Sequence, residues 1–189
     1  MKEFYAHGKL LLTGEYAITQ GANGFAVPTT LGQKLTVKFL DSPNIHWQAY
    51  TATGDCWLDV LLSSQLEILK TDQPKEAQHL VKQLQIVAAH SDKLTGGLHF
   101  KTHLEFDRSW GLGSSSTFTS LLAQFANLDV LDLFHGAHGG SGYDLACASA
   151  TGPILYHIEK GLAEATPVKW APDFADDLAF VFSGKKQLT

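Results

Sequence analysis

The sequence predicts a mixed α/β domain. Short strands follow one another over roughly the first sixty residues, where apolar side chains either run together or alternate with polar ones. A helix with apolar residues at spacings of three and four follows at 74–88, and a glycine-rich loop at 111–117 opens into another amphipathic helix. With 189 residues and 44% hydrophobic content, the chain can bury one core, or one core and the beginning of a second.

The N-terminal strands come first. Residues 9–19 begin as an apolar run typical of a buried strand and contain a turn or bulge at Gly14-Glu15. Two short strands are predicted at 25–27 and 35–40, because Pro28 and Gly32 punctuate the chain between them. The inward-facing residues of the second strand are expected to be Leu35, Val37 and Phe39.

Further elements follow in order. Residues 45–51 and 56–61 predict a hairpin, and Pro74 is expected to occupy the first position of the helix at 74–88. The remaining predictions are a strand at 98–106, a short helix at 129–134, a second glycine-rich turn that leads into a helix of small residues at 139–150, and closing strands at 153–158 and 178–183.

Composition excludes several classes of protein. Fourteen basic and nineteen acidic residues give a net charge of −5 without a basic run, which argues against nucleic acid as a partner. The N-terminus lacks a long apolar segment, so we expect a cytoplasmic protein that binds no membrane. Cys56 and Cys147 are expected to be buried free thiols, and the nine histidines form no recognisable metal-binding pattern.

The loop at 111–117 has the composition of an anion-binding site. Gly111 and Gly113 allow a phosphate to approach the backbone, and the following run of hydroxyl residues begins a helix whose free N–H groups and dipole favour negative charge. The same pattern is also typical of an ordinary helix cap. Both interpretations remain open for this segment taken alone.

Other polar residues give the loop a chemical context. Lys9 and Glu15 flank the first turn, and Asp144 follows the second glycine-rich segment. A small-molecule kinase needs such a set, because it must hold phosphates, neutralise their charge and place a base near the acceptor hydroxyl. The loop lacks the lysine of a P-loop and the third glycine of a dinucleotide-binding fingerprint.

Three segments resemble motifs of the GHMP kinases, which are named for galactokinase, homoserine kinase, mevalonate kinase and phosphomevalonate kinase. Residues 6–17 resemble the first motif, residues 111–116 resemble the phosphate loop, and residues 140–144 fall where the family carries its catalytic aspartate. The order and spacing of the three also agree. The wording Gly-Tyr-Asp-Leu-Ala at 142–146 resembles the mevalonate-kinase-like subgroup labelled GYDIA.

The resemblance implies a two-layer α/β fold of the ribosomal protein S5 domain 2 type, with ATP and Mg²⁺ at the site. It implies that Asp144 accepts the proton of the substrate hydroxyl, that Lys9 stabilises developing charge and that Glu15 orients Lys9 or the metal shell. Ser115 would supply a hydroxyl to Mg²⁺. The expected nucleotide-binding residues are Gly111, Leu112, Gly113, Ser114, Ser115, Ser116 and Thr117. Tyr16 and Tyr143 are expected on the substrate side.

The chain also departs from the family pattern. The resemblance places a metal-binding glutamate at the position of Leu133, and the neighbouring Asp132 is a candidate substitute. Nothing after Ser183 resembles the third family motif. We therefore expect 1–184 to be the N-terminal domain and 185–189 to be the start of a missing C-terminal domain. Apolar surface left exposed in this way would favour a homodimer.

The expected activity is transfer of the ATP γ-phosphate to a hydroxyl of mevalonate or a similar small hydroxy acid, as in isoprenoid biosynthesis. Phosphomevalonate kinase is an alternative, because residues 14–17 and 144–148 also resemble wording found there. A nucleotide-binding module without catalysis is a second alternative, since the metal carboxylate and the third motif are absent. An S5-like RNA-binding domain conflicts with the net charge of −5.

Overall fold

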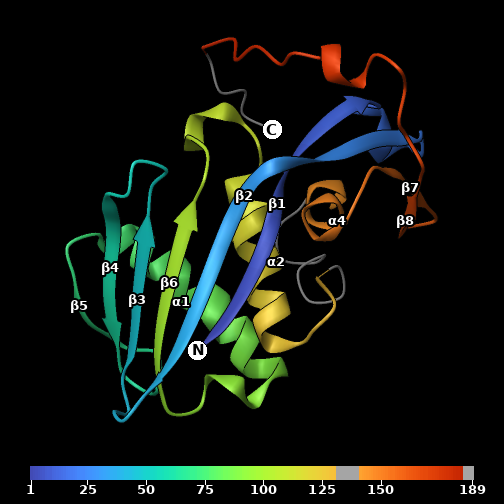
Figure 1. Cartoon of the computed structure of the whole chain (residues 1–189). Coiled ribbons are helices and arrows are strands. Elements are labelled where there is room, and N and C mark those ends of the chain that lie inside the picture. The colour runs from blue at the N-terminus through green and yellow to red at the C-terminus, as the bar shows by residue number, and fades with distance from the viewer. Residues whose placement is uncertain (131–140, 185–189) are drawn as a thin grey trace.

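The structure is a computed structural model that describes residues 1–130 and 141–184. In that part of the chain one mixed sheet is covered on one face by helices, so the molecule has two layers (Figure 1). The strands are β1 (Lys2–Thr13), β2 (Gly24–Leu40), β3 (Ile45–Tyr50), β4 (Cys56–Leu62), β5 (Ile68–Thr71), β6 (Gly97–Leu104), β7 (Ile154–Glu159) and β8 (Leu162–Pro167). The α-helices are α1 (Pro74–His90), α2 (Ser114–Ala126) and α4 (Tyr143–Ser149).

The sheet is organised around β2. The strand order is β5-β4-β3-β6-β2-β7-β8, and β1 pairs with β2. β1 runs antiparallel along one edge of β2, whereas the other edge is shared by β6, opposite 33–40, and β7, opposite 24–26. β3 and β6 are parallel, and the other neighbours in the described sheet are antiparallel. One long strand thus joins the two parts of the sheet.

The prediction of two short strands at 25–27 and 35–40 is wrong, because both belong to the 17-residue strand β2. Pro28 lies between the parts of β2 that pair with β7 and β6, so its missing N–H removes no ladder bond on that edge. The N–H of Gly32 donates to the Glu105 carboxylate at 3.0 Å. Tertiary contacts therefore allow the strand to continue through both residues.

Phe39 is 62% exposed, contrary to the prediction that it faces the core. β1 begins opposite Val37, so Phe39 extends beyond the strand that would cover it. Leu35 and Val37 are fully buried as predicted. The alternating pattern of residues 35–39 correctly predicts which side chains share a face, but it does not show where the neighbouring strand β1 begins.

Aromatic side chains form the centre of the core between the sheet and the helices. Trp47 of β3 stacks on Phe100 of β6 with ring centroids 4.8 Å apart, and it meets Phe118 of α2 edge-on at 5.6 Å. Phe125, about two turns further along α2, contacts Phe100 with ring centroids 5.1 Å apart. Such offset and edge-on pairs add to the burial energy of the rings, and they fix α2 against the sheet.

Several local predictions are confirmed. The hairpin is β3–β4, and the helix begins at Pro74 and buries Ala77, Leu80, Leu84 and Val87. The strand before the glycine loop is β6, and the helix of small residues is α4. Most of the predicted helix at 129–134, together with Asp132, Leu133 and Gly140, lies outside the described residues.

The predicted closing strand at 178–183 is wrong, because these residues form no strand. β7 pairs instead with β8 across a two-residue turn, in which Lys160 has φ 52° and Gly161 has φ 81°. Positive φ at both positions is the signature of the tight turn that suits a hairpin. The Lys-Gly pair was the signal, but lysine at such a position is uncommon and the strand after it is mostly exposed.

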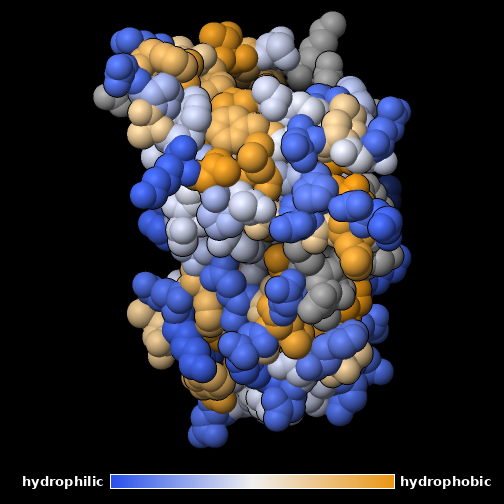
Figure 2. Space-filling view, turned by 90° about the vertical axis from the view of Figure 1, so that its right-hand side faces the viewer, coloured by the Kyte–Doolittle hydropathy of each residue, from blue (hydrophilic) through white to orange (hydrophobic). Residues whose placement is uncertain are grey.

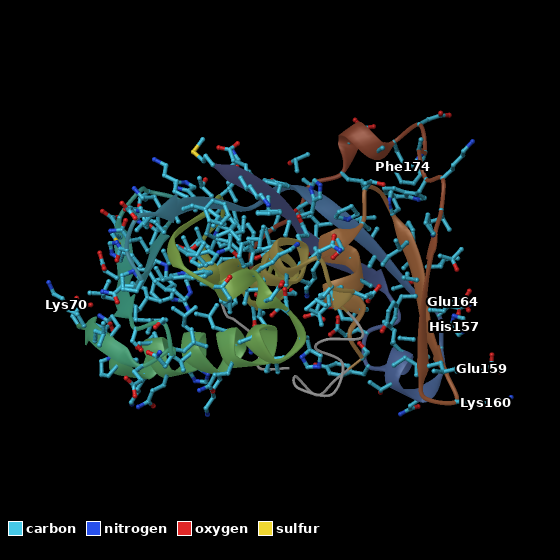
Figure 3. The ribbon with its side chains drawn as sticks, turned by 90° about the horizontal axis from the view of Figure 1, so that it is seen from below. Lys70, His157, Glu159, Lys160, Glu164 and Phe174 are labelled. Carbon is cyan, nitrogen blue, oxygen red and sulfur yellow. The ribbon has the colours of Figure 1, made fainter. Side chains whose placement is uncertain are left out.

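The C-terminal segment exposes large apolar side chains. Figure 2 shows hydrophobic surface gathered at the upper end of the face that carries β7, β8 and this segment, and Figure 3 marks the position of Phe174 on the segment. Val181 is 91% exposed. The largest exposed apolar residues of the segment are Phe174, Leu178, Phe180, Val181 and Phe182.

Glu105 fixes the point at which β6 passes into the glycine loop. Its carboxylate accepts hydrogen bonds from the Tyr5 hydroxyl at 2.7 Å and from the Gly32 N–H, and it pairs with Lys34 at 3.0 Å. Partial burial raises the pKa of Glu105, but these hydrogen bonds outweigh it and the pKa lies below its usual value. The start of the loop is thereby attached to both β1 and β2.

Both cysteines are free, as predicted, although Cys56 is exposed rather than buried. Burial raises the pKa of the Cys147 thiol to about 12, with a smaller contribution from Asp144. In the described part of the chain, no helix is both long and apolar enough to span a bilayer.

We predict that Gly97→Ala destabilises the fold. A Cβ at this position would lie 1.8 Å from the Ser42 carbonyl oxygen and 2.7 Å from that of Leu40, so the backbone of the β2–β3 connection must shift. Overpacking of this kind costs about 1–3 kcal/mol or more. Urea unfolding should show the loss. In the matched control Gly152→Ala the new Cβ meets nothing within 4 Å; an equal loss in the two variants would contradict the prediction.

Candidate active site

A cleft of about 570 Å³ is lined by residues of β1, the glycine loop, the start of α4 and the C-terminal segment. These elements are far apart in the sequence, and the fold places them side by side. The predicted site residues that line the cleft are Lys9, Glu15, Gly111, Gly113, Ser114, Ser115, Ser116, Tyr143 and Asp144.

Lys9 connects three of these elements. The register of β1 against β2 shifts between His7 and Lys9, which marks a bulge, and the Lys9 backbone N–H donates to the Leu112 carbonyl at 2.9 Å. The Lys9 Nζ donates to the Tyr143 hydroxyl at 2.8 Å and lies 5.0 Å from the centroid of that ring. Main chain and side chain of one residue therefore join β1 to the loop and to α4.

The glycine loop turns twice through the left-handed region, at Gly111 (φ 75°) and Gly113 (φ 86°). Gly113 is the N-cap of α2, and no described side chain caps this helix start. The Ser116 hydroxyl donates to the Gly113 carbonyl at 2.9 Å rather than accepting from the backbone. The interpretation of the serines as ordinary caps therefore does not fit, and the first N–H groups of α2 remain available to an anion.

The four hydroxyl residues of the loop have different environments. Ser115 is exposed and Ser114 is half-buried, whereas Ser116 and Thr117 are buried. Thr117 lies outside the cleft, because its hydroxyl donates to the Gln33 side chain at 2.7 Å. This buried bond fixes α2 to β2, and only Ser115 presents a largely open hydroxyl.

Asp144 lies in the first turn of α4, two residues after Gly142, which has a left-handed backbone conformation. Its side chain is half-buried, and the Leu145 N–H donates to its Oδ1 at 3.1 Å. The Tyr156 hydroxyl donates to the Ser141 carbonyl just before this turn. Burial, with a contribution from Asp144, raises the pKa of Tyr156 to about 12, so this phenol stays neutral and keeps the bond.

Tyr143 lines the cleft together with Lys9, Glu15 and Asp144. Burial raises the pKa of Tyr143, the bond from Lys9 opposes the rise, and the charges of Asp144 and Glu15 add to it. None of the ion pairs found between described residues joins Lys9 to Asp144. The ammonium and the carboxylate therefore line the same cleft without a direct ion pair. Tyr16 is 67% exposed and does not line the cleft.

A second cavity, which the sequence interpretation missed, lies on the other side of the α2 start. Its volume is about 520 Å³, and Trp47, Trp57 and Phe118 give it aromatic walls. Arg108, Ser114 and Ser115 line both cavities. The signal in the sequence was the isolated Trp57 next to a predicted turn, but nothing local shows that β4 brings this ring to the glycine loop.

The donor set is compatible with Mg²⁺ bound mainly by phosphates. Within the described residues, no cluster of three His, Cys, Asp or Glu side chains could hold a metal ion by itself. Mg²⁺ on a nucleotide, however, keeps several waters and needs only one or two protein oxygens. The exposed Ser115 hydroxyl and the Glu15 carboxylate both line the cleft and could supply them.

The sequence matches no protein-family model and no curated protein. The structure is similar to the mevalonate kinase of Methanococcus jannaschii, with a TM-score of 0.64 and 16% identity over 93% of this chain. It is also similar to Lactococcus lactis galactokinase in complex with galactose, with a TM-score of 0.63 and 16% identity over 89% of this chain. A third similar structure is Streptococcus pneumoniae phosphomevalonate kinase in complex with phosphomevalonate and AMPPNP, with a TM-score of 0.57 and 21% identity over 83% of this chain.

The chain has the fold of these kinases. The two-layer α/β fold that the resemblance implied is therefore confirmed. The chain spans about half of each structure, 57%, 47% and 50% respectively.

We predict that Gly113→Ala costs more stability than Gly111→Ala. Both glycines have positive φ, so each alanine bears a backbone cost of about 1–2 kcal/mol. Only at Gly113 would the Cβ also crowd side chains, at 2.6 Å from Ser116 Oγ and 3.2 Å from Lys9 Cε. This crowding should add about 1 kcal/mol or more to the loss of unfolding free energy in Gly113→Ala.

Chemical denaturation of the two variants beside the wild type measures this difference. Because the backbone cost is shared, the comparison isolates the crowding of Ser116 and Lys9 by a side chain at position 113. Equal free energies of unfolding for the two variants would show that the loop tolerates a side chain beside Lys9.

Proposed function

We propose that the protein is an ATP-dependent small-molecule kinase of the GHMP type, and that it phosphorylates a hydroxyl of mevalonate or a similar small hydroxy acid. The observation that carries the proposal is the arrangement of one cleft, in which an uncapped helix start, an ammonium and a carboxylate face the same space. The similarity of fold to kinases supports the proposal. The match of residues 142–146 to the GYDIA wording supports the mevalonate-like subgroup.

The polyphosphate would lie at the start of α2. The free N–H groups of Ser114, Ser115 and Ser116 and the positive end of the helix dipole favour an anion there. Gly111 keeps the approach open, since nothing lies within 4 Å of a Cβ built there. The base and ribose would occupy the second cavity, where Trp57 and Phe118 offer flat apolar surfaces and the shared wall at Ser114 leads to the phosphates.

Asp144 and Lys9 would act on the acceptor. The substrate hydroxyl would give its proton to the Asp144 carboxylate while its oxygen forms a bond to the γ-phosphorus, and the bond from that phosphorus to the bridging oxygen of ADP breaks. Lys9 would stabilise the charge that develops on the transferred group. The bond from Lys9 to Tyr143 keeps the ammonium in the cleft before substrate arrives.

Ser115 and Glu15 would hold Mg²⁺ together with the phosphates of the nucleotide. The ion would supply additional positive charge at the phosphate oxygens. Proton acceptance and stabilisation of the transferred group would be performed by the protein itself, through Asp144 of α4 and Lys9 of β1.

The charge of the cleft bears on the identity of the acceptor. Its cationic lining side chains, within the described residues, are Lys9 and Arg108. A phosphorylated acceptor such as phosphomevalonate adds a second phosphate, for which a further cation would be expected. An acceptor with a single carboxylate is better matched to this lining.

We predict that the protein releases ADP from ATP in the presence of Mg²⁺ and mevalonate. A coupled ADP assay would compare mevalonate, phosphomevalonate, homoserine and galactose, with ATP alone as the blank. Preference for phosphomevalonate would support the alternative acceptor. ATP binding measured by calorimetry without ADP release for any acceptor would overturn the kinase proposal in favour of a nucleotide-binding module.

We predict that Asp144→Asn lowers kcat by about 10²- to 10⁴-fold, because a positioned general base contributes that much. The amide keeps the shape of the side chain, so the Kd for ATP should stay within a few-fold of the wild type. The coupled ADP assay and calorimetry measure the two quantities on the same preparation. Unchanged turnover would remove Asp144 from the role of base.

A further inference from the structure

We infer that Arg108 binds the phosphates of the nucleotide. In the free protein, the indole ring of Trp57 would keep its guanidinium beside the proposed phosphate site. The inference rests on the proposed nucleotide site and adds to it a phosphate-binding residue outside the motifs used so far. Arg108 is the single arginine of the sequence.

The position of the guanidinium is defined by an aromatic contact. Its Cζ lies 4.1 Å from the centroid of the Trp57 ring, within the range of a cation–π contact. Arginine stacks on an aromatic face and still directs its N–H groups outward in the plane of the guanidinium. None of the ion pairs between described residues includes Arg108, so no carboxylate neutralises it.

A preformed turn presents the side chain. Arg108 begins the 3-10 turn Arg108–Trp110, and the Asp107 carboxylate accepts bonds from the Ser109 N–H at 2.8 Å and the Ser109 hydroxyl at 2.6 Å. The Trp110 N–H donates to the Asp107 carbonyl at 3.0 Å. The hydrogen bonds from Ser109 hold the pKa of Asp107 below its usual value. Asp107 thus serves the turn and leaves Arg108 free to bind a ligand.

The position of Arg108 suits contact with the phosphate groups of a nucleotide rather than with its base or with the acceptor substrate. Arg108 lines the active-site cleft and the aromatic cavity, and both cavities meet at Ser114 and Ser115 at the start of α2. A ligand with an aromatic base on one side and phosphates on the other must pass this boundary. The planar fork of arginine matches phosphate oxygens in pairs, and Arg108 would add a charge on the side of the phosphates nearer Trp57.

Binding of a nucleotide would exchange one contact for another. The base competes for the face of Trp57 that the guanidinium covers, while the phosphates offer Arg108 stronger, charge-assisted hydrogen bonds. Removal of Arg108 should therefore weaken ligands that have phosphates without weakening the bare nucleoside. Adenosine should bind equally well or better, because the indole face is then uncovered.

The test measures the Kd values of ATP, ADP and adenosine by calorimetry for the whole chain and three variants. We predict that Arg108→Ala weakens ATP and ADP by about tenfold or more, the usual loss for a charged hydrogen bond, and leaves adenosine within twofold or tighter. Arg108→Lys should recover part of the loss, because it keeps the charge and loses the fork. Lys160→Ala, at the tip of the β7–β8 hairpin far from the cleft, is the control and should bind as the wild type does (Figure 3).

The outcomes separate the two proposals. Wild-type affinity for ATP in Arg108→Ala would overturn the role of Arg108 and leave the nucleotide site intact. Equal losses for ATP and adenosine would also overturn it, since they would indicate a structural role in the aromatic cavity. Failure of the wild type to bind ATP would overturn the proposed function itself. Thermal unfolding of each variant confirms that it is folded, and the exposed position of Arg108 makes truncation tolerable.

Discussion

The candidate site depends on the two hydrogen bonds of Lys9. One ties the backbone of β1 to the Leu112 carbonyl, and the other ties the ammonium to Tyr143 at the start of α4. Lys9 precedes the other two segments by more than a hundred residues of sequence, and each of the three contributes a different chemical group to one cleft. A half-buried ammonium has a strong requirement for acceptors and aromatic faces, so its position is well determined before any substrate is present.

The framework around this residue directs two helix starts toward one space. α2 and α4 both begin after a glycine in the left-handed region, and neither start has a side-chain cap. Two hydrogen bonds hold the helices in place: a buried one from Thr117 to Gln33 for α2, and a partly buried one between Ser120 and Ser149 for the α2–α4 contact. The polar groups at the front of the cleft therefore remain available to a ligand while those behind it are used for packing.

Much of the fold could be predicted from local pattern. The hairpin β3–β4, the helix α1 and the strand β6 follow from periodicity, because one buried face imposes its period on the sequence. The continuous strand β2 could not be predicted, since Pro28 and Gly32 normally interrupt a strand. β2 continues through them because β7 and β6 pair with it on either side of Pro28, and because the Glu105 carboxylate accepts the N–H of Gly32. β8 was missed because an exposed strand has no buried face to impose a period.

The sequence by itself determined which residues could form the site. Motif spacing singled out Lys9, the glycine loop and Asp144. Glycine permits the backbone conformation of the loop, and lysine and aspartate supply the charges, so residue type alone indicates these roles. Only the tertiary structure decided how they are used. It buries Ser116 and Thr117, leaves Ser115 open and joins the Lys9 ammonium to Tyr143. It also brings Trp57 to Arg108, a contact across the sheet that no local pattern encodes, since it depends on how distant strands pack.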